Sequence, residues 1–299
     1  MEIGIIINRV TFEARELINT AKKSFPGMNV EFYKNADLKF HLDDPDSTPS
    51  NVDVYLQRSL SYSRALYSSF LLENFGYKVI TSYDCLNKTG NKLITSQLLE
   101  NAKIPVPRTA IAFTKEMALE VIHDIGYPVI LKPIIGSWGR LVAMLDNDHA
   151  AVAVLEDREV LGNFYQKIFY IQEYVNKPSR TVKQFLNGSV VSRDIRAFVI
   201  GDQVISAMQR YEIPNDWRSN VTLGGKAEAV KITPELEELS LKAAKAVNGE
   251  IVGVDLMESE KGLVVVEING TPQFQGIMKS TGINIPKYIL EYVKDTVKK

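Results

Sequence analysis

Three oxygen-bearing side chains, Asp255, Glu267 and Asn269, lie near the end of the chain with the spacing expected of a divalent-cation site. They belong to two β-branched runs separated by a turn-like segment, which predicts an antiparallel hairpin. Folding about residues 260–261 brings Asp255 opposite Val266 or Glu267, and strand alternation puts Glu267 and Asn269 on one face. Carboxylate and amide oxygens are ligands that Mg²⁺ accepts, usually together with phosphate oxygens. The pattern therefore predicts a magnesium site.

The competing interpretation of this hairpin is an ordinary solvated strand face, which also alternates polar and apolar residues. Glu267 directly follows the continuous apolar run 263–266, which indicates a strand buried on both faces. A buried carboxylate pair without a cation would be destabilised by several kcal/mol. Burial therefore favours the metal interpretation.

A lysine beside a glycine-containing loop indicates a phosphate site. Lys132 lies at the end of the apolar strand 128–133, and the loop 134–140 follows it. Such a lysine can pair with one phosphate while N–H groups of the loop bind others. The loop is not a Walker A loop, which needs GxxxxGK[ST] at the start of a helix. A plain turn is the more common meaning of such a loop, and Trp138 is expected to pack against its neighbours.

Basic side chains form a third group, made of Lys92, Arg193, Arg196 and Arg210. In the strand that begins at Arg193, alternation points Asp194 and Arg196 to one face. Arginines there could neutralise a phosphoryl group during transfer. Each of them taken singly is better explained as part of a surface ion pair.

The elements that must position these side chains follow two patterns. Near the N-terminus, short β-branched runs alternate with helical patterns, which predicts a small parallel or mixed sheet covered by helices. The predicted strands there are 3–7, 52–57 and 79–81, and the predicted helices are 11–25 and 61–75. From residue 91 the predicted helices are 92–101, 114–125 and 148–155, and the predicted strands are 128–133, 141–145 and 169–175.

The remainder of the chain is predicted to be rich in strands. Asn187-Gly188 lies between apolar runs and is a type I′ hairpin signal, and Gly201-Asp202 predicts a second hairpin. Thr233 as an N-cap and Pro234 at the first helical position predict a helix that ends at Gly249.

Composition excludes several classes of protein. The net charge of −1 gives no overall basic field for nucleic acid, and the single cysteine, Cys85, leaves no partner for an intramolecular disulfide. No apolar stretch approaches the roughly 20 residues that span a bilayer. Residues 1–8 lack the basic region of a signal peptide and predict a first strand. We therefore expect a soluble cytoplasmic protein that binds neither nucleic acid nor membranes.

Four segments carry a resemblance to a known family: GYPVILKPIIGSWGR at 126–140, FYIQEYV at 169–175, GGKAE at 224–228 and VDLMES at 254–259. Together they resemble the ATP-grasp superfamily, and within it the lysine-biosynthesis ligases (LysX) and their arginine-biosynthesis relatives (ArgX), which are close to the ribosomal-protein S6 glutamate ligase. The resemblance implies an α/β (α+β) ATP-grasp fold with an N-terminal Rossmann-like pre-ATP-grasp domain. The implied boundaries are 1–88 for that domain, and 89–174 and 175–299 for two ATP-grasp subdomains.

The resemblance also implies a reaction. In this family ATP phosphorylates the side-chain carboxylate of the C-terminal glutamate on LysW, a small acidic zinc-containing carrier protein. The amine of 2-aminoadipate, or of glutamate in the ArgX branch, then attacks the acyl phosphate. ATP and Mg²⁺ are the implied cofactors, and a homodimer or homotetramer is the implied assembly. The alternatives are a dual-substrate enzyme, a ligase that adds glutamate to another acceptor, and an ATP-binding regulatory protein without turnover.

The resemblance assigns roles residue by residue. The expected ATP-binding residues are Lys92, Lys132, Gly136, Ser137, Trp138, Gly139, Arg140, Gln172, Glu173, Tyr174 and Val175. The expected Mg²⁺ ligands are Asp255, Glu267 and Asn269, and the expected catalytic residues at the transferred phosphoryl group are Arg196, Arg210 and Asn220. The expected substrate-binding residues are Arg58, Ser61, Arg193, Arg218, Ser219, Asn220, Asn269 and Thr271.

The chain departs from the family pattern after its hinge. Twelve residues, 181–192, intervene before the Asp-Ile-Arg that begins at Asp194, and they predict an extra ordered hairpin. Its closeness to the hinge suggests that it covers the nucleotide or contacts the carrier. The segment 269–274 lies where the two branches differ, and it does not choose between aminoadipate and glutamate.

Overall fold

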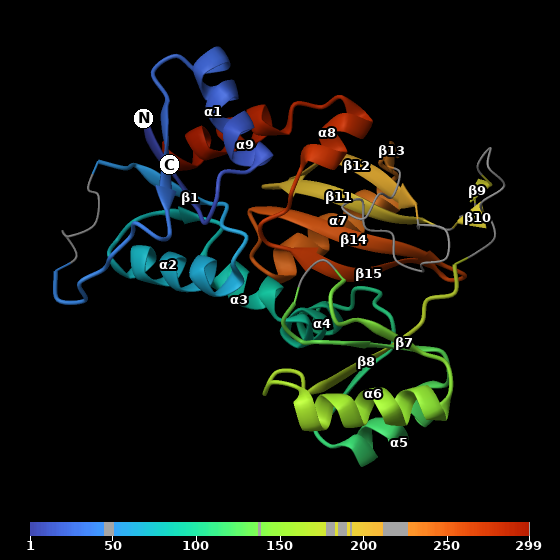
Figure 1. The fold of residues 1–299 in the computed structure, drawn as a ribbon. Coiled ribbons are helices and arrows are strands. Elements are labelled where there is room, and N and C mark those ends of the chain that lie inside the picture. The colour runs from blue at the N-terminus through green and yellow to red at the C-terminus, as the bar shows by residue number, and fades with distance from the viewer. Residues whose placement is uncertain are drawn as a thin grey trace.

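The fold contains three main sheets in a computed structural model, which describes residues 1–44, 51–136, 139–177, 183–184, 190–191, 193–211 and 227–298. Figure 1 shows an N-terminal sheet beside a C-terminal sheet, with a middle sheet below them. Mixed helices and sheets in this arrangement confirm the predicted α/β (α+β) class.

The N-terminal sheet is parallel and has the order β2-β1-β3-β4. Its central strand β1 is a nearly continuous apolar run, and the isoleucines of that run are buried. Such runs are typical of parallel strands covered on both faces by helices. The strands are β1 (Glu2–Ile7), β2 (Asn29–Lys34), β3 (Val54–Gln57) and β4 (Val79–Ile80), and the helices that follow β1, β3 and β4 are α1 (Phe12–Ser24), α2 (Tyr62–Asn74) and α3 (Tyr83–Gly90).

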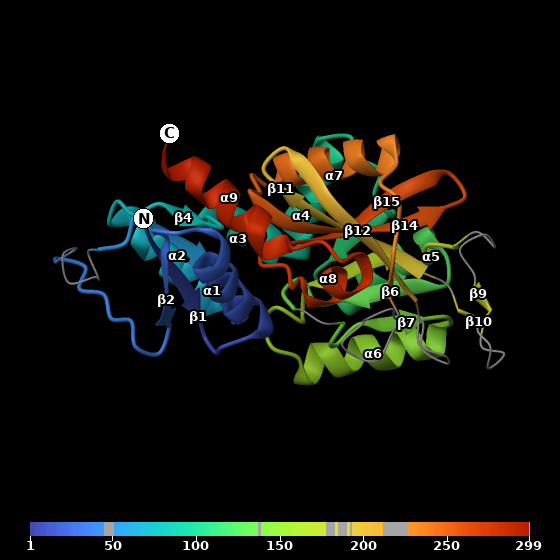
Figure 2. The ribbon, with the colours of Figure 1, turned by 90° about the horizontal axis from the view of Figure 1, so that it is seen from above.

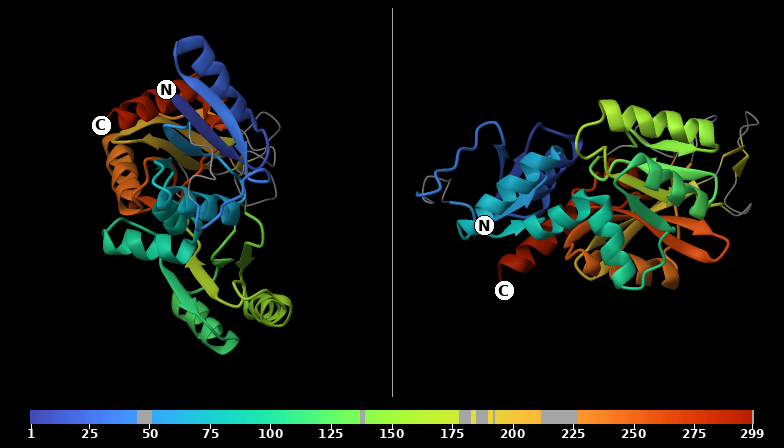
Figure 3. Two further views of the ribbon diagram at one scale, coloured as in Figure 1. Left: turned by 90° about the vertical axis from the view of Figure 1, so that its left-hand side faces the viewer. Right: turned by 90° about the horizontal axis from the view of Figure 1, so that it is seen from below.

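The middle sheet is antiparallel and has the order β5-β8-β6-β7. Two helices pack on one side of it and share its core, as the left view of Figure 3 shows. The strands are β5 (Thr109–Ala112), β6 (Val129–Lys132), β7 (Ala143–Leu145) and β8 (Phe169–Glu173), and the helices are α5 (Lys115–Ile125) and α6 (Asp148–Leu161). Helix α4 (Lys92–Asn101) precedes this sheet in the chain.

The C-terminal sheet has the order β13-β12-β11-β14-β15, with helix α7 on one face and helices α8 and α9 on the other (Figure 2). Its strands are β11 (Arg193–Ile200), β12 (Gln203–Tyr211), β13 (Ala227–Ala229), β14 (Ile251–Ser259) and β15 (Gly262–Asn269). The helices are α7 (Pro234–Ala246), α8 (Gln275–Thr281) and α9 (Ile285–Val297).

One hydrophobic core joins the N-terminal and C-terminal sheets. Ile5 of β1, Phe198 of β11 and Ile289 of α9 belong to the same cluster and are each fully buried. The middle sheet has a separate core, formed by residues between 112 and 171. The first and third sheets therefore form one packed unit, and the middle sheet forms another.

The structure confirms several local predictions and corrects others. Thr233 caps α7 by accepting a hydrogen bond from the Leu236 amide, and β11 and β12 form the hairpin predicted at Gly201-Asp202. Helix α7 ends before Gly249, because Asn248 already adopts a left-handed φ of 54°. Helix α6 extends to Leu161 rather than ending at residue 155.

The sequence predicted neither β2 nor β5. β2 (Asn29–Lys34) alternates charged and apolar residues and is largely exposed, and β5 (Thr109–Ala112) has only four residues, two of them alanine. Neither pattern resembles the apolar, β-branched runs on which the strand predictions relied.

The extra hairpin is described only in part. β9 (Lys183–Gln184) and β10 (Val190–Val191) pair antiparallel with each other, as a hairpin requires, and the turn at Asn187-Gly188 lies outside the described residues. Across the part of the chain that the structure describes, no helix is both long enough and apolar enough to cross a membrane.

Candidate active site

The hairpin of β14 and β15 positions the three candidate metal ligands. Asp255 pairs directly with Glu267, and Gly253 pairs with Asn269. Opposite residues of an antiparallel pair share a face, and so do residues two apart on one strand. The Asp255, Glu267 and Asn269 side chains therefore leave the sheet on the same side, as the register prediction required.

The prediction that β15 is buried on both faces is wrong. Val264 and Val266 are half-buried, and the Glu267 side chain is 35% exposed. Asp255, by contrast, is buried, with a side-chain exposure of 5%. Neither carboxylate therefore needs a cation to offset its burial, because Glu267 is partly exposed and Asp255 is paired with arginine.

Asp255 is held between two arginines. Arg196 lies opposite it on β11 and donates two hydrogen bonds to its carboxylate, from Nε to Oδ1 and from Nη2 to Oδ2, both at 2.6 Å. Arg210 Nη2 lies 3.3 Å from Oδ2 of the same carboxylate. Burial alone would raise the pKa of Asp255, but the two guanidiniums outweigh it and hold that pKa below its usual range. Asp255 is therefore an anion in the folded protein.

Asp194 completes this row of charges. It lies opposite Arg210 on the β11–β12 pair and accepts hydrogen bonds from Arg210 Nε at 2.6 Å and Nη2 at 2.9 Å. Burial would lower the pKa of Arg210, but Asp194 and Asp255 raise it overall. Positive and negative groups thus alternate across three strands in the order Arg196, Asp255, Arg210, Asp194.

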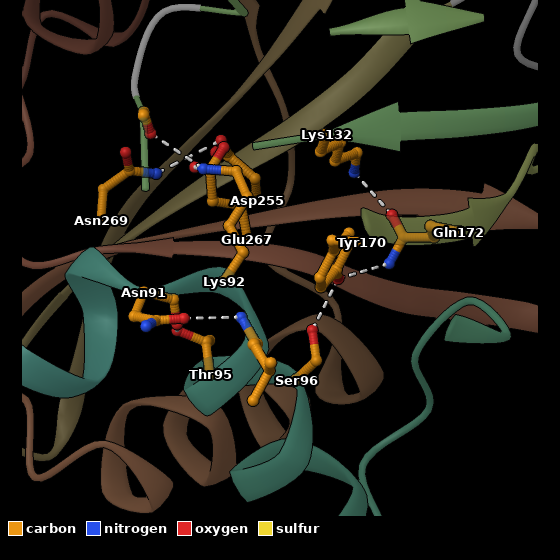
Figure 4. Close-up of polar contacts among 12 residues, drawn as sticks. Asn91, Lys92, Thr95, Ser96, Lys132, Tyr170, Gln172, Asp255, Glu267 and Asn269 are labelled. Atoms are coloured by element: carbon orange, nitrogen blue, oxygen red, sulfur yellow. Dashed lines mark hydrogen bonds and ion pairs between the residues drawn. The ribbon is translucent and has the colours of Figure 1, made fainter. Parts of the chain in front are cut away.

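Lys92 connects Glu267 to the loop after β6. It is the first residue of α4, which Asn91 caps by accepting hydrogen bonds from the Leu93 and Ile94 amides. Lys92 Nζ donates to Glu267 Oε1 at 2.8 Å and to the Gly136 carbonyl at 2.9 Å (Figure 4).

Lys132, at the end of β6, is half-buried beside this group. Its Nζ donates to Gln172 Oε1 at 2.6 Å. The pKa of Lys132 is lowered to about 8, mainly by desolvation; Glu267 opposes this shift and Lys92 adds to it. Burial thus disfavours the charged form of Lys132, as expected of a lysine whose partner is a bound anion.

The Gln172 side chain is fixed by a chain of hydroxyl groups that sequence reasoning missed. Gln172 Nε2 donates to Thr109 Oγ1 at 2.9 Å and to the Tyr170 hydroxyl at 3.1 Å, and that hydroxyl lies 2.7 Å from Ser96 Oγ. These contacts turn the amide oxygen toward Lys132 (Figure 4). A hydroxyl network across β5, β8 and α4 has no linear sequence signal, because its members are far apart in the chain.

A cavity of about 640 Å³ lies between the N-terminal sheet and this charged group. From the N-terminal part of the chain it is bordered by Glu13, Ser59 and Tyr62, and from α8 by Lys279. Of the residues expected to bind ATP, metal or substrate, those that border it are Gly136, Gly139, Arg196, Arg210, Asp255, Glu267, Asn269 and Thr271.

The other expected site residues are placed differently. Among the described residues, Arg58 and Ser61 do not border the cavity: Arg58 is buried beneath it, and Ser61 is the N-cap residue of α2. Glu173 Oε1 accepts a hydrogen bond from the Arg108 amide at 2.8 Å, and the Tyr174 amide donates to the Pro128 carbonyl at 3.3 Å. Arg140 is exposed and Val175 is half-buried.

Several expected residues fall where the structure gives no description. Ser137, Trp138, Arg218, Ser219 and Asn220 lie outside the described residues, and only the backbone of Arg193 is described.

The donor set fits a hard divalent cation. The candidate ligands are two carboxylates and an amide. In the described ranges no group of three or more His, Cys, Asp or Glu side chains comes together. Asn269 Nδ2 lies 3.4 Å from Asp255 Oδ2, and Glu267 is directly opposite Asp255 in the hairpin. Oxygen donors of this kind suit Mg²⁺ when phosphate and water complete the shell.

Comparison with known proteins places the chain among ATP-grasp sequences. Residues 89–293 match the RimK-like ATP-grasp domain, and residues 3–87 match the LysX preATP-grasp domain. The chain is 39% identical over 290 residues to the alpha-aminoadipate–LysW ligase LysX of Saccharolobus solfataricus, covering 96% of this chain and 99% of the relative. It is 38% identical over 248 residues to the glutamate–LysW ligase ArgX of Sulfurisphaera tokodaii, covering 83% of each.

Solved structures share the fold. A RimK domain ATP-grasp protein from Sphaerobacter thermophilus superposes with a TM-score of 0.77 at 22% identity, over 98% of this chain and 99% of that one. D-alanine–D-alanine ligase from Bacillus anthracis gives 0.70 at 17% identity, over 99% of this chain and 97% of that one.

Proposed function

The chain belongs to the RimK-like ATP-grasp family, and from that membership we propose that it joins the amino group of 2-aminoadipate to LysW in lysine biosynthesis. The bond would form at the side-chain carboxylate of the carrier's C-terminal glutamate. ADP and phosphate would be released. The enzyme is an ATP-dependent ligase that forms an amide.

One structural observation carries this proposal: Arg196, Arg210 and Asp255 border a cavity between the N-terminal and C-terminal parts of the chain, together with Glu267, which pairs with Lys92. A carboxylate is inert toward amines until one of its oxygens becomes a leaving group. Transfer of the γ-phosphoryl group from ATP to the carboxylate oxygen makes an acyl phosphate. The neutral amine then attacks the carbonyl carbon, phosphate leaves, and the amine loses a proton.

The residues divide between these steps by their chemistry. Lys92 and Lys132 would pair with phosphates of ATP, and Arg196 and Arg210 would offset the charge of the transferring phosphoryl group. Asp255, Glu267 and Asn269 would hold Mg²⁺, which would supply positive charge to offset that of the phosphates. We assign the pre-ATP-grasp domain to 1–88 and the two ATP-grasp subdomains to 89–174 and 175–299.

Glutamate is the second candidate substrate, because an ArgX relative is nearly as similar as the first LysX relative. The two amino acids differ by one methylene, which apolar contacts distinguish by only about 1–3 kcal/mol. Coverage of nearly the whole chain by LysX relatives supports aminoadipate as the preferred substrate.

The test is ligation to a defined carrier. The enzyme is incubated with Mg·ATP, purified LysW, and aminoadipate, glutamate, lysine or leucine, and both carrier mass and ADP are measured. We expect products with aminoadipate and glutamate, aminoadipate being preferred, and negligible product with lysine or leucine. A site that hydrogen-bonds a distal carboxylate rejects ligands that lack it, because its donors would stay unpaired.

The matched control is LysW without its last residue, which lacks the accepting carboxylate. Equal modification of the truncated carrier would contradict the mechanism, and efficient use of leucine would contradict the substrate class. ATP binding without ADP release under any condition would favour the regulatory alternative.

A further inference from the structure

The loop that connects β15 to α8 forms one wall of the cavity. It begins after Asn269, and the cavity is bordered by Asn269, Thr271 and Gln273. Thr271 and Gln273 are two residues apart, and between them Pro272 is buried. The loop therefore borders the cavity along its length from Asn269 to Gln273.

The backbone of this loop is bound by three side chains from the first ninety residues. Thr81 Oγ1 donates to the Gly270 carbonyl at 2.9 Å, and Arg58 Nη2 donates to the Pro272 carbonyl at 2.6 Å. Glu13 Oε1 accepts from the Gln275 amide at 3.3 Å. The three side chains come from separate elements: Glu13 is in the first turn of α1, Arg58 follows β3, and Thr81 follows β4.

The Arg58 side chain carries a charge, and burial of a charged group costs free energy. It is only 5% exposed, and its guanidinium carbon lies 5.5 Å from the centre of the Phe274 ring. Burial lowers the pKa of Arg58 to about 10, with Glu13 opposing the shift. Among the described residues, Arg58 Nε has no hydrogen-bond partner. The contacts of this buried cation are thus directed at the loop, at Pro272 and Phe274.

The loop also approaches the N-terminal part of the chain too closely for a side chain at Gly270. A Cβ atom there would lie 2.5 Å from Thr89 Oγ1, on the last turn of α3. A hydrogen-bonded and sterically restricted backbone has few alternative conformations. The side chains of Asn269 and Thr271 are consequently presented in a fixed direction.

We propose that Glu13, Arg58 and Thr81 are positioning residues, which hold this loop so that its side chains form the wall that contacts the incoming amino acid. This inference rests on the proposed ligase function. It assigns Arg58 to the support of the substrate wall and not to direct binding of the substrate carboxylate. Lys92 and Lys132 touch none of the three anchors, so ATP binding should be independent of them.

The first experiment measures kinetics of Thr81→Val, which removes the hydroxyl at nearly constant volume. We expect the KM for the amino acid to rise about three- to tenfold, which corresponds to the loss of one buried hydrogen bond. The KM for ATP should stay within about twofold of wild type. Thr81→Ser keeps the hydroxyl and should restore most of the amino-acid KM.

The matched control is Ser69→Ala. Ser69 Oγ accepts a buried hydrogen bond from Gln57 Nε2, within the same sheet region but away from the loop. Ser69→Ala should lower the free energy of unfolding about as much as Thr81→Val does. It should leave the KM for the amino acid and the KM for ATP unchanged. If Thr81→Val and Ser69→Ala change the two KM values alike, the positioning role is wrong and Thr81 only stabilises the fold.

A second measurement does not depend on activity. The Gln275 amide should exchange its hydrogen faster in Glu13→Leu than in wild type, while Glu13→Gln, which keeps an accepting oxygen, should remain protected. If the Gln275 amide of Glu13→Leu exchanged its hydrogen as slowly as that of wild type, Glu13 would not hold this part of the backbone. The two readouts can also differ. If the wild-type enzyme forms no product but the Gln275 amide exchanges faster in Glu13→Leu, then Glu13 holds the backbone and the proposed substrate is wrong.

Discussion

Asp255 and Glu267 lie opposite each other in one hairpin, but folding depends on them to different degrees. Asp255 neutralises Arg196 and Arg210, so its removal leaves a buried and a half-buried guanidinium without that partner. Glu267 faces Lys92 from a partly exposed position. Substitution of the two ligands should therefore separate catalysis from stability.

We expect Glu267→Gln to abolish ADP formation and to leave the melting temperature near that of wild type. Asp255→Asn should abolish ADP formation as well, but it should also lower the free energy of unfolding by about 3–5 kcal/mol, as breaking a buried ion pair does. Both quantities come from one preparation, by denaturant unfolding and an ADP assay. Wild-type turnover of folded Glu267→Gln at saturating Mg²⁺ would disprove the metal assignment.

Lys132 predicts a pH dependence of ATP binding. Its pKa is about 8 in the folded protein, below the roughly 10.4 of an unfolded chain. As pH rises through 8 the ammonium loses its proton, and the KM for ATP should rise. The same group binds its proton more weakly when folded, so its own contribution to stability increases between about pH 8 and 10.

The measurement is the KM for ATP from pH 7 to 9.5, with Lys132→Arg as the comparison. Arginine stays charged over this range, so its profile should be flat. A wild-type profile as flat as that of the variant would show that Lys132 does not contact a phosphate.

Residues on regular strands were the easiest to predict from sequence. Alternation alone put Glu267 and Asn269 on one face, and the turn between the two runs placed Asp255 opposite Val266 or Glu267, of which the structure has Glu267. Glu13 and Thr81 escaped prediction, because each acts through a backbone group nearly two hundred or more positions away in the chain. Arg58 was expected to bind the substrate, but it does not border the cavity, and its hydrogen bond to the Pro272 carbonyl spans a similar distance in the chain.

At the scale of elements, capping and turn signals predicted α7 and the β11–β12 hairpin, whereas α6 was longer than predicted. Local signals identify where an element begins more firmly than where it ends. The additional turns of α6 include Arg158, whose Nη2 donates to the Leu141 carbonyl at 2.6 Å. That tertiary contact has no counterpart in the local sequence pattern.

The β9–β10 pair is an element whose removal should affect function more than stability. Its two described strands pair with each other and form a separate two-stranded sheet. An isolated hairpin adds little to folding stability. Deletion of residues 181–192 should therefore leave the melting temperature almost unchanged and raise the KM for ATP or for the carrier.

Steady-state kinetics with each substrate in turn, alongside thermal unfolding, tests this deletion. Unchanged KM values for ATP and carrier would remove any role in nucleotide or carrier binding. Replacement of the same twelve residues by a glycine–serine linker of equal length is the control for chain connectivity.

At the scale of the whole molecule, the two cores explain why the site lies where it does. Lys132 and Gln172 come from the middle sheet, whereas Asp255 and Arg196 come from the unit that the other two sheets share. The lysine and the carboxylates thus belong to separately packed bodies. The family resemblance implied three domains, 1–88, 89–174 and 175–299, and did not predict that the first and last sheets share one core.

The core shared by the two ends of the chain has a consequence during synthesis. Ile3 and Ile5 pack in the same cluster as Ile289 and Val293, so β1 is fully covered only after α9 has been synthesised. The core of the middle sheet, within residues 112–171, is continuous in sequence and has no such delay. Long-range contacts form late and leave apolar surface exposed meanwhile. We therefore expect the apolar surface of β1 that α9 covers to stay exposed between the synthesis of the two elements, and a chaperone that recognises apolar segments to bind it in that interval.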